Sequence, residues 1–166
     1  GATGRFVRIS LPGDKRTLTL AEVEVYSDGK NVAKGGKATQ STTSHNGDAA
    51  RAIDGNKNPD YNAGGQTHTT NDRKDPWWEL DLGKEVELTS IGVWNRKGFE
   101  SRLDGFTLEV LDASKKPVFS RKEIVAPATA VHVRLDQEEA ELAYVDGKGK
   151  PAKAGDWKGN RNAAQE

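Results

Sequence analysis

Residues 6–11, Phe6-Val7-Arg8-Ile9-Ser10-Leu11, place apolar side chains at every second position. Val7, Ile9 and Leu11 share one parity, and successive side chains of a β-strand point to opposite faces of its sheet. A turn signal follows directly at residues 12–14, Pro-Gly-Asp. The stretch therefore predicts a half-buried strand in an antiparallel sheet.

The same period of two recurs through the chain. Residues 17–26 alternate with a change of phase at Ala21-Glu22, which predicts a β-bulge. The other strands are expected over residues 77–82, 90–95, 105–111, 117–121 and 131–135. Since no long amphipathic helix is predicted, the fold class is all-β, antiparallel.

The composition argues against several classes of function. The 166 residues predict one domain, and the balance of 25 basic against 25 acidic side chains gives no electrostatic reason to expect nucleic acid as partner. No apolar run approaches the ~18 residues of a membrane span, so membrane insertion is not expected. The absence of cysteine excludes disulfides and thiol chemistry.

Two segments depart from the strand pattern. Residues 35–76 are polar and rich in Gly, Asn, Thr and Asp, and a loop of this length is usually functional. From residue 137 the composition shifts to Gly, Lys and Ala. We therefore expect a sandwich over residues 1–136 and a tail or linker over 137–166, on which Tyr144, Val145 and Trp157 could still dock.

Several motifs occur in a characteristic order between residues 31 and 111: Gly36–Ser41, Arg51–Asn56, Thr67–Thr69, Asp75–Gly83 and Trp94–Phe106. In this order they resemble the F-type lectin (fucolectin) branch of the discoidin, or F5/8 type C, superfamily. The resemblance implies a discoidin-like antiparallel β-sandwich, a jelly roll.

A further match lies outside that order. Residues 6–26 resemble the last strands of such a domain, which predicts a circularly permuted sandwich whose final hairpin comes from the N-terminus. In the alternative, residues 1–26 end a preceding, truncated domain.

The resemblance implies a structural Ca²⁺ on the long loop. Residues 54–60 do not make an EF-hand, because Pro59 and Gly65 stand where that loop needs Gly and Glu. The family's ligands would instead fall on the side chains of Asp54 and Glu22 and the carbonyls of Arg51, Asn56, Gly65 and Ala21. Gly65 replaces a family Ser and loses one hydroxyl ligand. The alternative is an Asp-Gly turn without metal.

The resemblance also implies a carbohydrate site. The family's fucose motif, a His and two Arg, falls on His68, Arg96 and Arg102, with Phe99 and Tyr61 as candidate aromatic contacts. Guanidinium groups suit sugar hydroxyls because they present several donors in a rigid fork. Gly98 replaces a family Asp and a cysteine pair is missing, so galactose-type or sulfated sugars stay open beside fucose. In the plainer interpretation the arginines are salt-bridged loop residues and His68 caps a turn.

These observations predict a non-catalytic carbohydrate-binding module. We expect it to be appended to a larger secreted bacterial protein, at an extracellular, cell-surface or periplasmic location. The sequence contains no nucleophile elbow, phosphate loop or metal-hydrolase motif, so we expect no enzyme. The alternative is a structural or protein-binding discoidin-type domain. Trp77 and Trp78 are both expected in the core.

Overall fold

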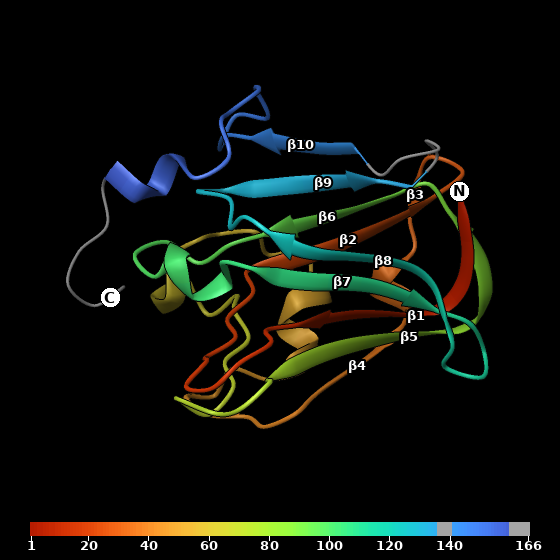
Figure 1. Cartoon of the computed structure of the whole chain (residues 1–166), viewed down its shortest axis with the longest axis horizontal. Helices are drawn as coiled ribbons and strands as arrows, with labels where there is room; N and C mark the ends of the chain where they lie inside the picture. Colours follow the sequence, from red (N-terminus) through yellow and green to blue (C-terminus); the bar gives the residue numbers. More distant parts are fainter. Residues whose placement is uncertain (136–140, 160–166) are drawn as a thin grey trace.

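The computed structural model describes residues 1–135 and 141–159, which form two antiparallel sheets facing each other (Figure 1). One five-stranded sheet has the order β4-β5-β1-β7-β8 and the other the order β10-β9-β6-β2-β3. The strands are β1 (Ala2–Ser10), β2 (Glu22–Ser27), β3 (Lys30–Asn31), β4 (Lys37–Gln40), β5 (Trp77–Leu88), β6 (Ser90–Trp94), β7 (Phe106–Leu111), β8 (Pro117–Ile124), β9 (Ala130–Arg134) and β10 (Glu141–Val145). The predicted all-β sandwich is confirmed.

Short 3₁₀ turns are the helical elements of the described residues. They are η1 (Ala33–Gly35), η2 (Ala49–Ile53), η3 (Tyr61–Ala63), η4 (Glu100–Leu103) and η5 (Asp156–Gly159). None of the described helices has the length and apolar character needed to cross a membrane.

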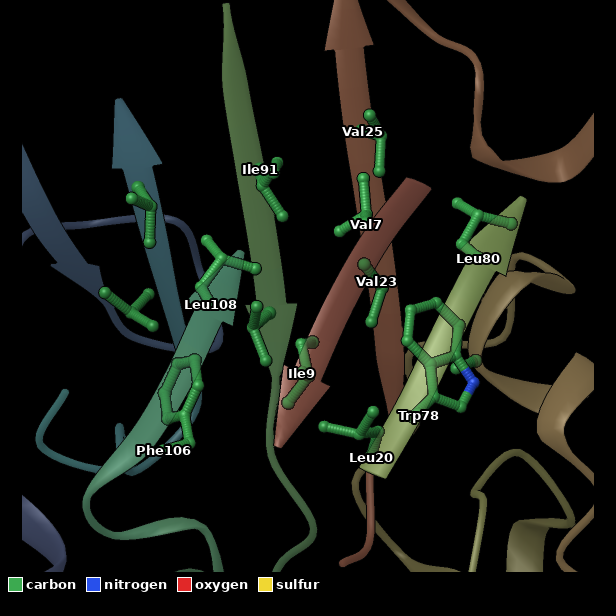
Figure 2. Close-up of a cluster of buried hydrophobic side chains, with 14 of the residues drawn as sticks. Val7, Ile9, Leu20, Val23, Val25, Trp78, Leu80, Ile91, Phe106 and Leu108 are labelled. Carbon is green, nitrogen blue, oxygen red and sulfur yellow. The ribbon is translucent and has the colours of Figure 1, made fainter. Parts of the chain in front are cut away.

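The core lies between the two sheets, as Figure 2 shows. β1, β5 and β7 place alternate side chains against those of β2 and β6, in keeping with their period of two. Completely buried members include Val7, Ile9, Trp78, Leu80, Phe106, Leu108, Val23, Val25 and Ile91. Each such side chain stabilises the fold by about 1.5–3 kcal/mol through burial.

The N-terminal strands complete this sandwich, as predicted. β1 is central in its sheet, pairing with β5 on one side and β7 on the other, and β2 pairs with β6 and β3. They do so as single strands of opposite sheets rather than as one paired hairpin. Residues 1–26 therefore belong to this domain and do not end a preceding one.

The segment between β1 and β2 differs from the prediction. Residues 17–21 are not a strand, and the change of phase at Ala21 marks the start of β2 rather than a bulge. Leu18 and Leu20 instead receive main-chain hydrogen bonds from Thr69 and Thr67, at 3.1 and 2.9 Å. The polar segment 35–76 also contains β4, η2 and η3, so it is less irregular than its composition suggested.

Part of the expected tail packs on the sandwich. β10 pairs with β9, and the Tyr144 hydroxyl donates to the carbonyl of Val125 at 2.6 Å. Trp157 is buried, and its indole N–H donates to the carbonyl of Ala126 at 2.5 Å. Residues 137–140 and 160–166 of the predicted tail lie outside the described residues, as does residue 136.

The adjacent tryptophans of β5 have different environments. Trp78 is completely buried and donates from Nε1 to the carbonyl of Ala49 at 3.0 Å. Trp77 lies half-buried on the outer face of the sheet, with the Arg8 guanidinium 4.4 Å from its ring centre. The core prediction was therefore right for Trp78 and wrong for Trp77, because neighbours on a strand face opposite ways.

Candidate functional site

His68 lies in a short extended segment that residues 18–20 hold from one side. Thr67 and Thr69 flank it, and each threonine bonds the opposite leucine twice. The hydroxyls of Thr69 and Thr67 accept from the main-chain N–H groups of Leu18 and Leu20, at 2.9 and 3.0 Å. Gly47 packs beneath, where a Cβ would lie 2.4 Å from the main-chain nitrogen of His68. The position of His68 is therefore fixed by packing and main-chain bonds.

The imidazole of His68 is held as one neutral tautomer. Nδ1 lies 2.6 Å from the carbonyl oxygen of Thr69, and because a carbonyl only accepts, Nδ1 carries the proton. Burial, together with the charges of Arg102 and Arg96, lowers the pKa of His68 to about 4. At neutral pH Nε2 is therefore a hydrogen-bond acceptor.

Two rings border His68. His45 stacks on it with ring centres 4.2 Å apart, and Tyr61 meets it edge-on at 5.7 Å. The Tyr61 hydroxyl donates to the carbonyl of His45 at 2.5 Å, which joins the two loops that carry the rings. His45 therefore lies at the rim of the site.

Arg96 lies between two aromatic rings. Its Cζ is 4.4 Å from the ring centre of Tyr61 and 4.3 Å from that of Phe99. Arg102 contacts the same Phe99, with Cζ at 4.2 Å. Such stacking fixes the plane of a guanidinium group and so pre-orients its donors. The structure thus brings together all five residues predicted for the sugar site.

The two arginines have donors without protein partners. Nε of Arg96 and Nη1 of Arg102 are buried and make no hydrogen bond with the protein. None of the ion pairs among the described residues includes either arginine. Burial lowers the pKa of both groups, and the charge of Arg96 lowers that of Arg102 further. Unpaired buried donors cost free energy, so this geometry favours an external acceptor over the salt-bridged alternative.

Two residues that the sequence did not single out hold the arginine loops. Asn95 is buried; its side chain donates to the carbonyls of Glu100 and Pro127 at 3.0 and 2.9 Å and accepts from the N–H of Arg96 at 2.8 Å. Arg16 donates from Nη2 to the carbonyl of Arg102. Both side chains donate to main-chain carbonyls. Because every residue has such a carbonyl, the sequence does not indicate these contacts.

The residues predicted to hold Ca²⁺ meet beside β2. Glu22 is buried, its Oε2 accepts from the N–H of Gly55 at 2.7 Å, and its Oε1 is buried without a partner. Burial, aided by the negative charges of Asp54 and Glu24, raises the pKa of Glu22 to about 8. A bound cation would stabilise the ionised carboxylate of Glu22. The oxygen atoms gathered here therefore fit Ca²⁺ as a ligand set.

The other predicted ligands lie in the same loop. The side chain of Asp54 accepts from the N–H of Asn56 at 2.9 Å, and Gly65 packs directly on the Asn56 amide. Within the described residues no group of three or more His, Cys, Asp or Glu side chains is placed to hold a metal. A cation here would therefore depend on main-chain carbonyls, as expected for Arg51, Asn56, Gly65 and Ala21.

Known proteins share this sequence in part. Fucolectin-1 of Anguilla japonica is 40% identical over 85 residues, which are 48% of this chain and 47% of that protein. Fucolectin of Anguilla anguilla is 39% identical over 72 residues, 40% of this chain and 45% of that protein. The chain thus spans about half the length of the curated relatives it matches.

Solved structures share the fold. A Streptococcus pneumoniae fucose binding module superposes with a TM-score of 0.61 at 32% identity, covering 70% of this chain and 84% of that one. The lectin domain of lectinolysin, solved with Lewis B antigen, gives 0.61 at 30% identity with the same coverage. These relatives are lectins and binding modules, in agreement with the expectation of a non-catalytic domain.

Residues 51–146 match the family model described as NedA-like, galactose-binding domain, of the F5/8 type C group. The match includes Asp54, His68, Arg96 and Arg102, and it spans more than half of the chain. The chain therefore belongs to the NedA-like, galactose-binding domain family, a discoidin-type β-sandwich akin to the F-type lectins.

Proposed function

We propose that this chain is a carbohydrate-binding module that recognises fucose-containing glycans through His68, Arg96 and Arg102. The observation that carries the proposal is the pair of buried, unpaired donors, Nε of Arg96 and Nη1 of Arg102, beside the acceptor Nε2 of His68. A sugar offers hydroxyl groups that accept from the first two and donate to the third.

The aromatic residues of the site suit the apolar part of such a sugar. Phe99 and Tyr61 stack on the guanidinium groups of the site. L-Fucose presents a methyl group and a patch of C–H bonds, which pack well against rings. This complementarity, together with the fucolectin and fucose-binding relatives, favours fucose over galactose-type or sulfated sugars as the primary unit.

No observation favours a protein-binding domain. Val118, 47% exposed, is the single large apolar side chain that is exposed within the described part of the chain. A protein-docking surface needs a contiguous apolar patch of a few hundred Å².

A structural Ca²⁺ belongs to the same proposal. The carboxylates of Glu22 and Asp54 would hold it, with carbonyls of Arg51, Asn56, Gly65 and Ala21. Its charge would keep Glu22 ionised and tie the loop around Asp54 to β2. The loop continues into Tyr61, so the ion would stabilise one wall of the sugar site.

The cellular setting follows from the ligand. A glycan-binding module works where glycans are displayed, so we infer an extracellular or surface location, as part of a larger secreted protein. In that setting the module would raise the local concentration of its neighbours on a glycan surface by avidity.

A glycan-binding screen with titration calorimetry tests the proposal. The wild type should bind fucosylated glycans, and the Arg96→Ala/Arg102→Ala double variant should lose at least 100-fold in affinity. Arg73→Ala removes an exposed arginine near the site and serves as the control that keeps binding. A folded wild type that binds no fucosylated, galactosylated or sulfated glycan would overturn the proposal.

A further inference from the structure

A second cavity, of about 350 Å³, lies at the same end of the sandwich as the arginine site. The residues that line it come from the end of β6, the start of β9 and the turn that follows β10, elements that lie at one end of the sandwich in Figure 1. Its lining consists of Lys57, Pro59, Trp94, Thr129, His132, Val145, Asp146, Gly147 and Gly149. The volume is within the range of small-ligand sites.

Polar groups without protein partners face this cavity. The indole N–H groups of Trp78 and Trp157 donate to main-chain carbonyls, whereas among the described residues that of Trp94 has no acceptor. The ring nitrogens of His132 and the hydroxyl of Thr129 also make no hydrogen bond with the described protein. The lining therefore offers both donors and acceptors to a ligand.

Gly92 allows the two rings to meet over the sheet. Trp94 and His132 contact edge to face with ring centres 5.3 Å apart. A Cβ on Gly92 would lie 2.6 Å from the Trp94 ring and 2.9 Å from that of His132. The floor of the cavity is thus an aromatic pair that a larger residue at position 92 would displace.

The charges around the cavity balance. Lys57 lies 4.9 Å from the centre of the Trp94 ring and 3.5 Å from a carboxylate oxygen of Glu24. Asp146 also lines the cavity, and its carboxylate accepts from the main-chain N–H groups of Lys148 and Lys150 at 2.9 Å. The cavity thus has side chains of both charges, unpaired hydrogen-bonding groups and an aromatic floor. This combination suits a neutral, polyhydroxylated ligand rather than an ion.

The cavity and the arginine site are built from the same two segments. Lys57 lies over Trp94 and Tyr61 lies over Arg96. The N–H of Lys97 donates to the carbonyl of Pro59 at 2.9 Å, which holds the two segments side by side.

From this arrangement we infer that the Trp94 cavity is a second saccharide subsite. It holds a neutral sugar unit of the same glycan whose fucose is bound by Arg96 and Arg102. This inference rests on the proposed function, which places the fucose at Arg96 and Arg102. The residues that line the Trp94 cavity would supply the contacts for the second sugar unit.

Titration calorimetry with methyl α-L-fucoside and a set of fucosylated oligosaccharides, Lewis B among them, tests the subsite. The wild type should bind at least one oligosaccharide tenfold or more tightly than the fucoside. Thr129→Val removes one hydroxyl at nearly constant volume, and Trp94→Phe removes the indole N–H together with part of the ring. Each should lower that preference at least threefold without changing fucoside affinity. Trp77→Phe, on the outer face of the opposite sheet, is the matched control.

The indole N–H resonance of Trp94, identified by its absence in Trp94→Phe, gives an independent reading. It should shift with the oligosaccharide and not with the fucoside. Fucoside binding with no oligosaccharide preference and no shift would overturn the subsite alone. A shift with oligosaccharide but no fucoside binding would support the cavity and overturn the fucose proposal, and the absence of both would overturn both.

Discussion

Arg16 donates from Nη2 to the carbonyl oxygen of Arg102 across 3.2 Å. The same nitrogen donates to the carbonyl of Asp104 at 2.5 Å, and Nη1 donates to that of Pro12 at 3.0 Å. A side chain from the loop after β1 thus fixes the main chain that carries a guanidinium of the proposed sugar site. The N-terminal segment therefore serves that site as well as the core.

Arg16→Met should weaken fucoside binding about tenfold, equal to about 1.4 kcal/mol. The substitution removes the donors that hold the Arg102 turn while the core stays intact. Calorimetry against the exposed Arg73→Met variant checks the effect. Arg16→Lys retains one donor and should recover part of the affinity, whereas equal affinity in all three proteins would contradict the positioning role.

Arg96→Lys keeps the positive charge but removes the plane that Tyr61 and Phe99 clamp. We expect about a tenfold loss of fucose affinity, because lysine presents a single rotatable ammonium in place of a rigid fork. Calorimetry at low and high salt separates the contribution of guanidinium geometry to the affinity from that of the positive charge, because only the latter is screened by salt. If charge alone mattered, the lysine variant would bind like the wild type.

The pH response of binding follows from His68. Its pKa in the folded protein, about 4, lies below the ordinary value near 6.5, so Nε2 stays free to accept from pH 8 down to 5. Fucose affinity should be flat over that range and fall near pH 4. An NMR titration of the His68 ring measures the midpoint directly, and a midpoint near 6.5 would be inconsistent with the buried tautomer.

The same pKa affects the free energy of unfolding. Between about pH 6.5 and 4 the unfolded chain binds a proton on this histidine that the folded protein does not. Stability from His68 is therefore present above pH 6.5 and is lost as the pH falls through this window, by a few kcal/mol at most. Urea unfolding at a series of pH values would record that slope.

Calcium should raise the unfolding temperature. Saturation at 100 times Kd contributes about 2.7 kcal/mol, or roughly 5–10 °C for a chain of this size. Glu22→Gln should abolish the shift, and Glu24→Gln, a neighbour on β2 not among the proposed ligands, should retain it. Thermal scans with Ca²⁺ and with EDTA provide the measurement; an identical shift in both variants would place the ion elsewhere.

Trp157→Phe should destabilise the fold by about 2 kcal/mol. A benzene ring replaces the indole, so part of the buried ring is lost, and the carbonyl of Ala126 also loses its hydrogen bond. Thermal unfolding should show a fall of roughly 4–8 °C. Trp77→Phe, a half-buried tryptophan on the sheet surface, should change stability far less; equal effects would mean that the docked segment adds nothing.

The sequence contained enough information for the sandwich and for the grouping of the residues proposed to bind sugar, for different reasons. Period-two alternation such as Val7, Ile9 and Leu11 follows directly from the geometry of a half-buried strand. His68, Arg96 and Arg102 were found through motif order, and the fold brought them together. Arg16 and Asn95 were missed because their partners are carbonyls of remote segments, which carry no residue identity.

The difference at residues 17–21 has a physical cause. Leu18 and Leu20 alternate like a strand and are buried, but their main-chain bonds go to Thr69 and Thr67, outside both sheets. Alternation of apolar and polar residues indicates that one face of a segment is buried. It does not indicate which segment forms hydrogen bonds with its main chain. His45 lies in a turn, with a φ of +54°, and its ring stacks on that of His68. The sequence does not predict this contact, because the two histidines lie in different loops.

The central place of β1 has a consequence for biosynthesis. Among the strands of this domain β1 is translated first, yet Phe6 pairs with Asp81 on one side and Leu111 on the other. The nascent chain must therefore carry an apolar strand with two open edges until most of the domain has been translated. Pairing over such sequence separations folds slowly and leaves edges open to aggregation, so this domain folds late in synthesis and depends on protection of its first strand until then.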